Sequence, residues 1–266
     1  MNRHLPAAVA VVALLACAAA APKPHHEASH DDASHDDASM GPRPVKLSGY
    51  LQGPTLDGKT ILGPPPAADS PQGKADRAEF EVTRALQGSA RWKTAIQDND
   101  LWGGGAVRRF ACAMGVGLGP RTTPATYRLL QRVELDVRTV GTPAKDYYDR
   151  KRPLIGNDAP VCVPREEWMK TNASYPSGHA MTAWSWALIL TELAPDKADP
   201  LLTVGRESGD SRVICGVHFI SDVEAGRTLG AAMVARLHAD PAFTADLARA
   251  KRELAHTKAR PEGCGG

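Results

Sequence analysis

The spacing of apolar residues predicts a chain built from helices. Between residues 124 and 137, apolar side chains recur at intervals of three and four, which is typical of one face of an amphipathic helix. They are Tyr127, Leu130, Val133 and Val137. Residues 179–193 are apolar nearly all round, so this helix should lie at the centre of the domain. No stretch alternates apolar and polar residues as a strand would, and the expected fold class is all-α.

Capping signals predict where the other helices begin and end. Ser70-Pro71 is typical of an N-cap followed by proline at the first helical position, and Gly88 should end that helix. Ser221-Asp222-Val223-Glu224 is a capping-box pattern that opens another helix. Pro241 begins a last, charged helix. Two long loops remain, at 49–70 and 153–176.

Residues 1–21 have the layout of a secretory signal peptide, in which Arg3 precedes an apolar stretch and a run of small residues. Two forms of cleavage fit. Leu14-Leu15-Ala16-Cys17 resembles a lipobox, after which Cys17 would carry a lipid, whereas Ala18-Ala19-Ala20 fits ordinary signal peptidase. An uncleaved anchor is disfavoured, because the apolar run is slightly shorter than the roughly 20 residues of a membrane span. We expect a periplasmic protein, either free or held at the outer membrane through Cys17.

Residues 22–48 are expected to form a disordered tether. The unit Ala-Ser-His-Asp-Asp occurs twice, and the segment has almost nothing apolar to bury. Histidine-rich tracts can also bind metal loosely, so a non-enzymatic exported metal-binding lipoprotein is an alternative to a solvated spacer. Residues 49–262 then form one folded domain.

Composition narrows the class of protein further. With 42% hydrophobic residues, no heptad or collagen repeat and one apolar run, the chain is neither disordered throughout, nor fibrous, nor a multi-span membrane protein. The net charge of +2 is too balanced for a dedicated nucleic-acid binder. Residues 23–40 carry −4 and residues 1–22 carry +1, which leaves +5 on the remainder and a mild preference for anionic ligands.

Four cysteines remain when Cys17 is set aside: Cys112, Cys162, Cys215 and Cys264. In an oxidising compartment they can form two disulfides in three alternative pairings. The alternative is that Cys112 and Cys215 are small buried hydrophobic residues. No pair has the C-x-x-C spacing of a metal site.

Three short motifs carry groups suited to phosphoryl transfer. Lys145 is followed after six residues by Arg152-Pro153, and Pro-Ser-Gly-His ends at His179 where a helix begins. Ser211-Arg212 is followed after five residues by His218 and after three more by Asp222.

Phosphoryl transfer needs cations for the equatorial oxygens and an in-line nucleophile opposite the leaving group. Three cations, a serine hydroxyl and a glycine N–H at a helix N-terminus would bind the oxygens. They belong to Lys145, Arg152, Arg212, Ser177 and Gly178. One histidine would attack phosphorus while the other protonates the departing oxygen, and Asp222 would accept the proton on the far nitrogen of His218.

Together these motifs resemble those of the bacterial class A non-specific acid phosphatases, in the type 2 phosphatidic acid phosphatase superfamily, whose site the vanadium haloperoxidases share. The resemblance covers roughly residues 49–240 and includes Arg91-Trp92 and the run from Asp149 to Pro153. It implies a helical-bundle acid phosphatase of broad specificity for small phosphomonoesters, without metal or other cofactor, that also transfers phosphate to other alcohols.

By the same resemblance, His218 is the nucleophile that forms a phosphohistidine, Asp222 orients it, and His179 is the acid for the leaving alcohol and then the base for water. The five residues named above hold the phosphoryl oxygens. Leu154 stands where an aromatic residue is expected, which would change the wall of the substrate pocket. His238 and His256 match no motif and should be exposed polar residues.

Two alternatives use the same site. A vanadate-dependent haloperoxidase would bind vanadate with His218 as ligand, but its length and flanking sequence resemble this chain less. A lipid pyrophosphate phosphatase would normally have several membrane spans. As partners we expect small phosphomonoesters and further copies of this chain, no nucleic acid, and the membrane only through a lipid on Cys17.

Overall fold

The computed structural model describes residues 47–53 and 56–264 of the chain. The predicted signal peptide, the Cys17 lipobox and nearly all of the predicted tether lie outside these residues. The described part contains helices and no strand, which confirms the all-α prediction. None of its helices is at once long enough and apolar enough to cross a bilayer.

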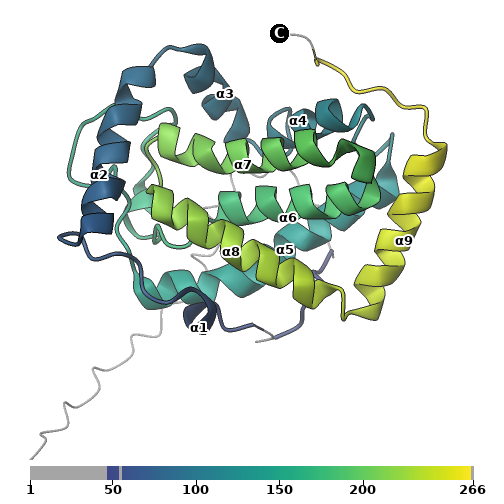
Figure 1. The fold of residues 1–266 in the computed structure, drawn as a ribbon, viewed down its shortest axis with the longest axis horizontal. Coiled ribbons are helices and arrows are strands. Elements are labelled where there is room, and N and C mark those ends of the chain that lie inside the picture. The colour runs from purple at the N-terminus through teal and green to yellow at the C-terminus, as the bar shows by residue number, and fades with distance from the viewer. Residues whose placement is uncertain (1–46, 54–55, 265–266) are drawn as a thin grey trace, which may run out of the picture. The chain divides into compact units, whose positions relative to one another are not determined.

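The helix predicted at the centre is α6 (Gly178–Leu193), which lies between α7 (Ala198–Ile214) and α8 (Ile220–Leu237) in Figure 1. Glycine allows these helices to approach closely. A Cβ at Gly226 of α8 would lie 2.5 Å from the carbonyl oxygen of Ser177, so no side chain fits there. The close packing fixes the beginning of α6 against α8.

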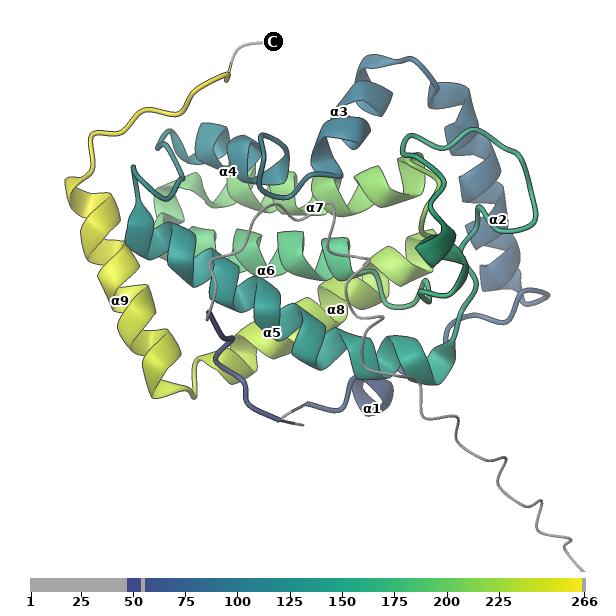
Figure 2. The same cartoon turned by 180° about the vertical axis from the view of Figure 1, so that it is seen from behind.

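Helix α5 (Pro124–Tyr148) lies on the other side of α6, as the view from behind shows (Figure 2). Its predicted apolar face is confirmed, because Leu130, Val133 and Val137 are all buried. The Trp186 indole of α6 donates to the Leu130 carbonyl oxygen at 3.0 Å, so its one polar group is satisfied inside the core.

The remaining helices surround this centre. These helices are α1 (Gly58–Leu62), α2 (Pro71–Thr83), α3 (Ala90–Asp98), α4 (Ala106–Met114) and α9 (Pro241–His256). Helices α2 and α3 lie toward one end of α7, and α9 lies toward the other end (Figure 1). Two predicted loops are shorter than expected, since α1 lies within 49–70 and a 3-10 turn, Glu167–Lys170, lies within 153–176.

Two predicted helix ends are wrong. Ser70 caps α2 as expected, with its hydroxyl accepting from Gly73 N–H at 3.0 Å, but the α-helix ends at Thr83. A 3-10 turn follows, and Gly88, at φ 78°, lies in the link to α3 rather than at the end of α2. Helix α8 begins at Ile220, because the Asp222 carboxylate accepts from the Phe219 N–H at 2.7 Å. The N-cap is therefore Phe219 rather than Ser221, and the capping box predicted at 221–224 does not form.

Both disulfides form, so the alternative of buried thiols at Cys112 and Cys215 is wrong. Cys112 pairs with Cys264 and Cys162 with Cys215, at Cα–Cα distances of 5.4 and 4.5 Å. The first ties α4 to a residue just beyond the predicted domain end. The second ties the 153–176 loop to the turn after α7, next to the segment that carries His218.

Candidate active site

The three sequence motifs meet at one end of the helices. α6 begins, α7 ends and α8 begins at the end of the bundle nearest α2 in Figure 1. The first motif reaches the same place because Asp149 ends α5 in the left-handed conformation, at φ 43°, and turns the chain. Aspartate tolerates this conformation better than most residues.

The two nitrogens of His218 face different partners. Nε2 lies 3.2 Å from Nη1 of Arg152, whereas Nδ1 lies 3.2 Å from the Ser174 hydroxyl and 3.5 Å from Oδ2 of Asp222. An arginine can only donate, so Nε2 must be the accepting nitrogen in this arrangement. The hydrogen of a neutral imidazole then lies on Nδ1. The residue is only 2% exposed, and its accepting lone pair is directed toward Arg152.

Asn172 connects the two cations of the first motif. Its side-chain oxygen accepts from Nη2 of Arg152 at 2.6 Å and from Nζ of Lys145 at 3.4 Å. Backbone oxygens complete the arrangement, with Arg152 Nε donating to the Asn172 carbonyl at 3.0 Å and Lys145 donating to the Ala173 carbonyl at 2.6 Å. The loop before α6 therefore orients both cations.

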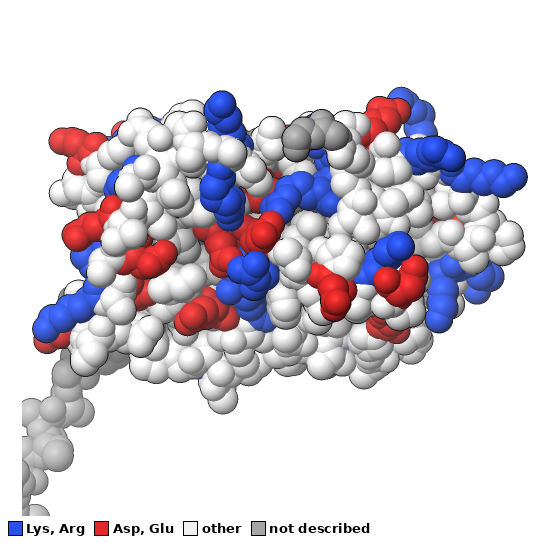
Figure 3. Space-filling model, turned by 45° about the horizontal axis from the view of Figure 1, so that its top comes forward, with Lys and Arg blue, Asp and Glu red and all other residues white. Residues whose placement is uncertain are grey.

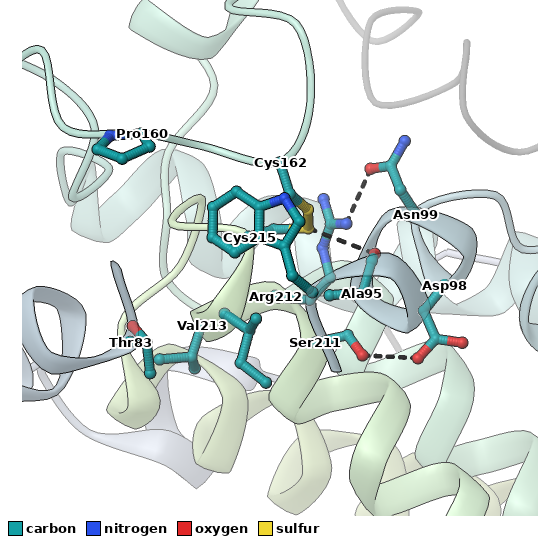
Figure 4. Close-up of a disulfide and its surroundings, with 12 residues drawn as sticks. Thr83, Ala95, Asp98, Asn99, Pro160, Cys162, Ser211, Arg212, Val213 and Cys215 are labelled. Carbon is teal, nitrogen blue, oxygen red and sulfur yellow. Dashed lines mark hydrogen bonds between the residues drawn. A yellow bond between two sulfur atoms is a disulfide. The ribbon is translucent and has the colours of Figure 1, made fainter. Parts of the chain in front are cut away.

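Asn99 plays the corresponding part for the other two motifs. Its side-chain oxygen accepts from Nη1 of Arg212 at 2.8 Å, as Figure 4 shows, and its carbonyl oxygen lies 3.0 Å from Nε2 of His179. The neighbouring Asp98 accepts from the Ser211 hydroxyl at 2.6 Å. Two successive residues at the end of α3 thus hold the Ser-Arg pair of α7.

Backbone hydrogen bonds join the segment before α6 to α8, and the end of α7 to the segment that carries His218. The Ser177 N–H donates to the Asp222 carbonyl at 2.9 Å, and the His218 N–H donates to the Arg212 carbonyl at 3.3 Å. The structure therefore brings together all eight residues predicted for the site. They are Lys145, Arg152, Ser177, Gly178, His179, Arg212, His218 and Asp222.

The first turn of α6 offers room for a ligand at Gly178. A Cβ built on this residue would meet no described atom within 4 Å, in contrast to the crowded Gly226 nearby. The Ser177 hydroxyl caps the helix, accepting from the Ala180 N–H at 3.4 Å. Helix N-termini favour anions because their first N–H groups point outward without intrahelical partners.

Several contributors to the site were not found from the sequence. Asn99, Asn172 and Ser174 belong to none of the motifs, although Ser174 directly precedes the Tyr-Pro-Ser-Gly-His run. The sequence carries no signal that Asn99 approaches His179, which lies 80 residues further along the chain.

Two predictions about residues near the motifs can be compared with the structure. Leu154 is buried with Trp92 and Met169 in a small apolar cluster. His238 directly follows the last residue of α8, and His256 is the last residue of α9. His238 Nε2 contacts the Glu192 carboxylate at 2.8 Å, and His256 is exposed.

The face drawn in Figure 3 carries charges of both signs. Acidic and basic side chains lie next to one another across the face drawn in Figure 3. Ion pairs also occur between side chains of the described part, such as Arg206 with Asp210 at 3.0 Å. No group of three or more histidine, cysteine, aspartate or glutamate side chains in the described part is arranged to hold a metal ion. The histidine-rich tract lies outside that part.

Comparison with known proteins gives a consistent family assignment. Residues 136–243 match the model of the PAP2 superfamily. The chain is 40% identical over 195 residues to an acid phosphatase of Zymomonas mobilis, covering 73% of this chain and 74% of that one. It is 38% identical over 206 residues to a non-specific acid phosphatase of Salmonella typhimurium, covering 75% and 81%.

A solved structure is also similar. The transmembrane PAP2-type phosphatidylglycerolphosphate phosphatase of Bacillus subtilis aligns with a TM-score of 0.46 and 21% sequence identity, over 64% of this chain and 86% of that one. This likeness is too distant to bear on function.

Proposed function

Since this chain belongs to the PAP2 superfamily and, within it, to the non-specific acid phosphatases, and is thus a phosphatase, we propose that it hydrolyses a broad range of phosphate monoesters through a phosphohistidine at His218. The observation that carries the proposal is the orientation of His218, whose Nε2 faces Arg152 while Nδ1 faces Ser174 and Asp222. A nucleophile needs an unprotonated nitrogen, and Nε2 is the nitrogen whose lone pair is directed toward Arg152.

In the first step, Nε2 of His218 forms a bond to phosphorus as the bond to the alcohol oxygen breaks. His179 gives its proton to that oxygen, so a neutral alcohol leaves. The hydrogen on Nδ1 stays directed at the Ser174 hydroxyl, and the nearby Asp222 carboxylate stabilises the positive charge on the ring. Lys145, Arg152 and Arg212 balance the charge of the three equatorial oxygens.

In the second step, His179 takes a proton from water as the water oxygen attacks phosphorus, and the bond to Nε2 of His218 breaks. Phosphate leaves and both histidines return to their first states. A second alcohol in place of water would receive the phosphoryl group, so the same steps include phosphotransfer. The first turn of α6 at Ser177 and Gly178 contributes N–H groups to the phosphoryl oxygens in both steps.

The proposal includes export to the periplasm, supported by the signal-peptide pattern of residues 1–21. Whether Cys17 carries a lipid is answered by metabolic labelling with a radioactive fatty acid. Labelled protein that loses its label in a Cys17→Ala variant would establish the anchor, and an exported, unlabelled protein would exclude it.

The activity is tested with the purified protein, p-nitrophenyl phosphate and glycerol phosphate, with a chelator present throughout. We expect hydrolysis of both substrates, and a loss of at least about three orders of magnitude in His218→Ala, as for other catalytic nucleophiles. Turnover within about tenfold of the unaltered enzyme in this variant would rule out the covalent route. Activity that requires a divalent metal or the tract at 22–48 would favour the metal-binding alternative instead.

A further inference from the structure

A buried ionic network holds Asp222 from the side opposite His218. Oδ1 of Asp222 accepts from Nη1 of Arg150 at 2.6 Å, while Nη2 of the same arginine donates to Oδ2 of Asp76 at 2.7 Å. Both carboxylates are fully buried, and the arginine side chain is only 12% exposed. Arg150 therefore lies between two negative charges that have little contact with water.

Ser221 closes the network into a ring. Its hydroxyl donates to Oδ2 of Asp76 at 2.5 Å and accepts from Arg150 at 2.7 Å, and its N–H donates to Oδ1 of Asp76 at 3.0 Å. Asp76 belongs to α2, Arg150 to the segment after α5, and Ser221 to the first turn of α8. The contacts thus fix the beginning of α8, and with it Asp222, against two other parts of the chain.

The contact between Asp222 and His218 is made through the Ser174 hydroxyl. The direct distance from Nδ1 of His218 to Oδ2 of Asp222 is 3.5 Å, longer than a charge-assisted hydrogen bond of about 2.7–2.9 Å. The Ser174 hydroxyl lies 3.2 Å from Nδ1 and donates to Oδ2 at 2.5 Å. With its one hydrogen directed at Asp222, the hydroxyl is left to accept from Nδ1–H.

The sharing of the Arg150 charge between Asp76 and Asp222 sets how strongly Asp222 accepts the hydrogen bond from Ser174. With Asp76 ionised, Arg150 shares its positive charge between two carboxylates. With Asp76 neutral, that charge is balanced by Asp222 alone, and Asp222 becomes a weaker acceptor for Ser174. In a buried site such changes are large, because little solvent screens them.

We propose that Ser174, together with the Asp76–Arg150 pair, positions the nucleophile. The Ser174 hydroxyl links the Asp222 carboxylate to Nδ1 of His218 by two hydrogen bonds. Asp76 takes up part of the positive charge of Arg150, so that Asp222 remains a strong hydrogen-bond acceptor for Ser174. The proposal rests on the proposed function of His218. These residues touch neither the phosphoryl group nor the leaving group, so they act on the orientation and hydrogen position of the ring. Such positioning changes the rate of a step that uses His218 more than the affinity of the cationic site for anions.

The first test compares Ser174→Ala with Ser185→Ala. Ser185 is a buried serine of α6 that donates to the Gly230 carbonyl at 3.4 Å, and it serves as the control for losing a buried hydroxyl. We expect kcat of Ser174→Ala to fall about 10- to 100-fold, by analogy with the loss on removing a group that orients a metal-ligating histidine. KM and the inhibition constant of vanadate should stay within about threefold, because the cations are untouched. Ser185→Ala should keep the kcat of the unaltered enzyme.

The second test compares Asp76→Asn with Asp136→Asn. Asp136 is also fully buried, but its carboxylate accepts from the N–H groups of Tyr50 and Leu51, neither of which belongs to the site. We expect Asp76→Asn to lower kcat and to slow phosphoenzyme formation in a single turnover, with vanadate inhibition retained. Asp136→Asn should leave both rates unchanged.

The outcomes separate this inference from the proposed function. If His218→Ala still forms a phosphoenzyme at the normal rate, the proposed function fails. If His218→Ala is inactive while Ser174→Ala and Asp76→Asn keep normal kcat values, only the inference fails. It also fails if their losses in kcat are matched by equal losses of vanadate affinity and of thermal stability, because the residues would then be merely structural.

Discussion

Replacing Gly178 with alanine separates the binding of a phosphoryl group from the folding of α6. The added Cβ meets no described protein atom within 4 Å, so the substitution costs nothing in packing against that part of the chain. Alanine is favoured over glycine inside a helix by up to about 1 kcal/mol. For a protein of this size, we therefore expect Tm to stay the same or to rise by up to about 3 °C.

Activity should change in the opposite direction. The Cβ would occupy the space through which a phosphoryl oxygen approaches the N–H groups of the first turn of α6. Losing one hydrogen bond to a charged group costs about 1.5–3 kcal/mol. With a factor of ten for every 1.4 kcal/mol, kcat/KM of Gly178→Ala should fall about 10- to 150-fold.

The assay is the hydrolysis of p-nitrophenyl phosphate, measured alongside thermal unfolding of the same samples. Gly226→Ala is the matched control, because its Cβ would lie 2.5 Å from the Ser177 carbonyl and should lower Tm. Normal kcat/KM in Gly178→Ala would refute the placement of the phosphoryl group at this helix end. A large fall of Tm in the same variant would refute the claim that the space is open.

Three further predictions concern other parts of the molecule. His179→Ala should slow the hydrolysis of glycerol phosphate far more than that of p-nitrophenyl phosphate, whose leaving group needs little protonation; equal losses would show that His179 is not the general acid. Vanadate resembles the five-coordinate transition state and should bind more tightly than phosphate, and Arg212→Ala should reduce that preference; an unchanged ratio of inhibition constants would count against Arg212 as a ligand. Burial of His238 opposes its charging, but hydrogen bonds to the Val234 carbonyl and to Glu192 outweigh burial and raise its pKa. The pair therefore stabilises the fold below the unfolded pKa of about 6.5 and ceases to do so as the pH rises through the folded pKa. Glu192→Gln should lower Tm by about 1–3 °C at pH 5.5 and not at pH 9, as expected for an exposed pair; the same difference at both values would contradict the assignment.

The helices and the three motifs that meet at one end of them were recognisable because their signals are local. Apolar residues at intervals of three and four marked α5, and Pro-Ser-Gly-His lies where α6 begins. Each motif carried its chemistry within a dozen residues, and together they resembled one family. The spacing alone did not place the motifs in contact; that expectation came from the chemistry of phosphoryl transfer and the resemblance.

What escaped prediction depends on contacts between distant parts of the chain. The capping box was misplaced because Asp222 turns back to the Phe219 N–H, while Ser221, the expected N-cap, binds Asp76 on α2. Asn99 and Asn172 are ordinary polar residues in the sequence, and only the fold gives each of them two site residues to hold. The disulfide pairing could not be predicted either, because it depends on which distant segments the fold brings together.

The central claim is that the phosphoryl group passes through Nε2 of His218. Enzyme mixed with labelled p-nitrophenyl phosphate, quenched in alkali within one turnover and digested, allows the labelled peptide to be mapped and the phosphorylated nitrogen to be identified. We predict one labelled site, on Nε2 of His218, formed and lost at rates that account for kcat. A label on another residue or on Nδ1 of His218, or no phosphoenzyme during turnover, would contradict the account.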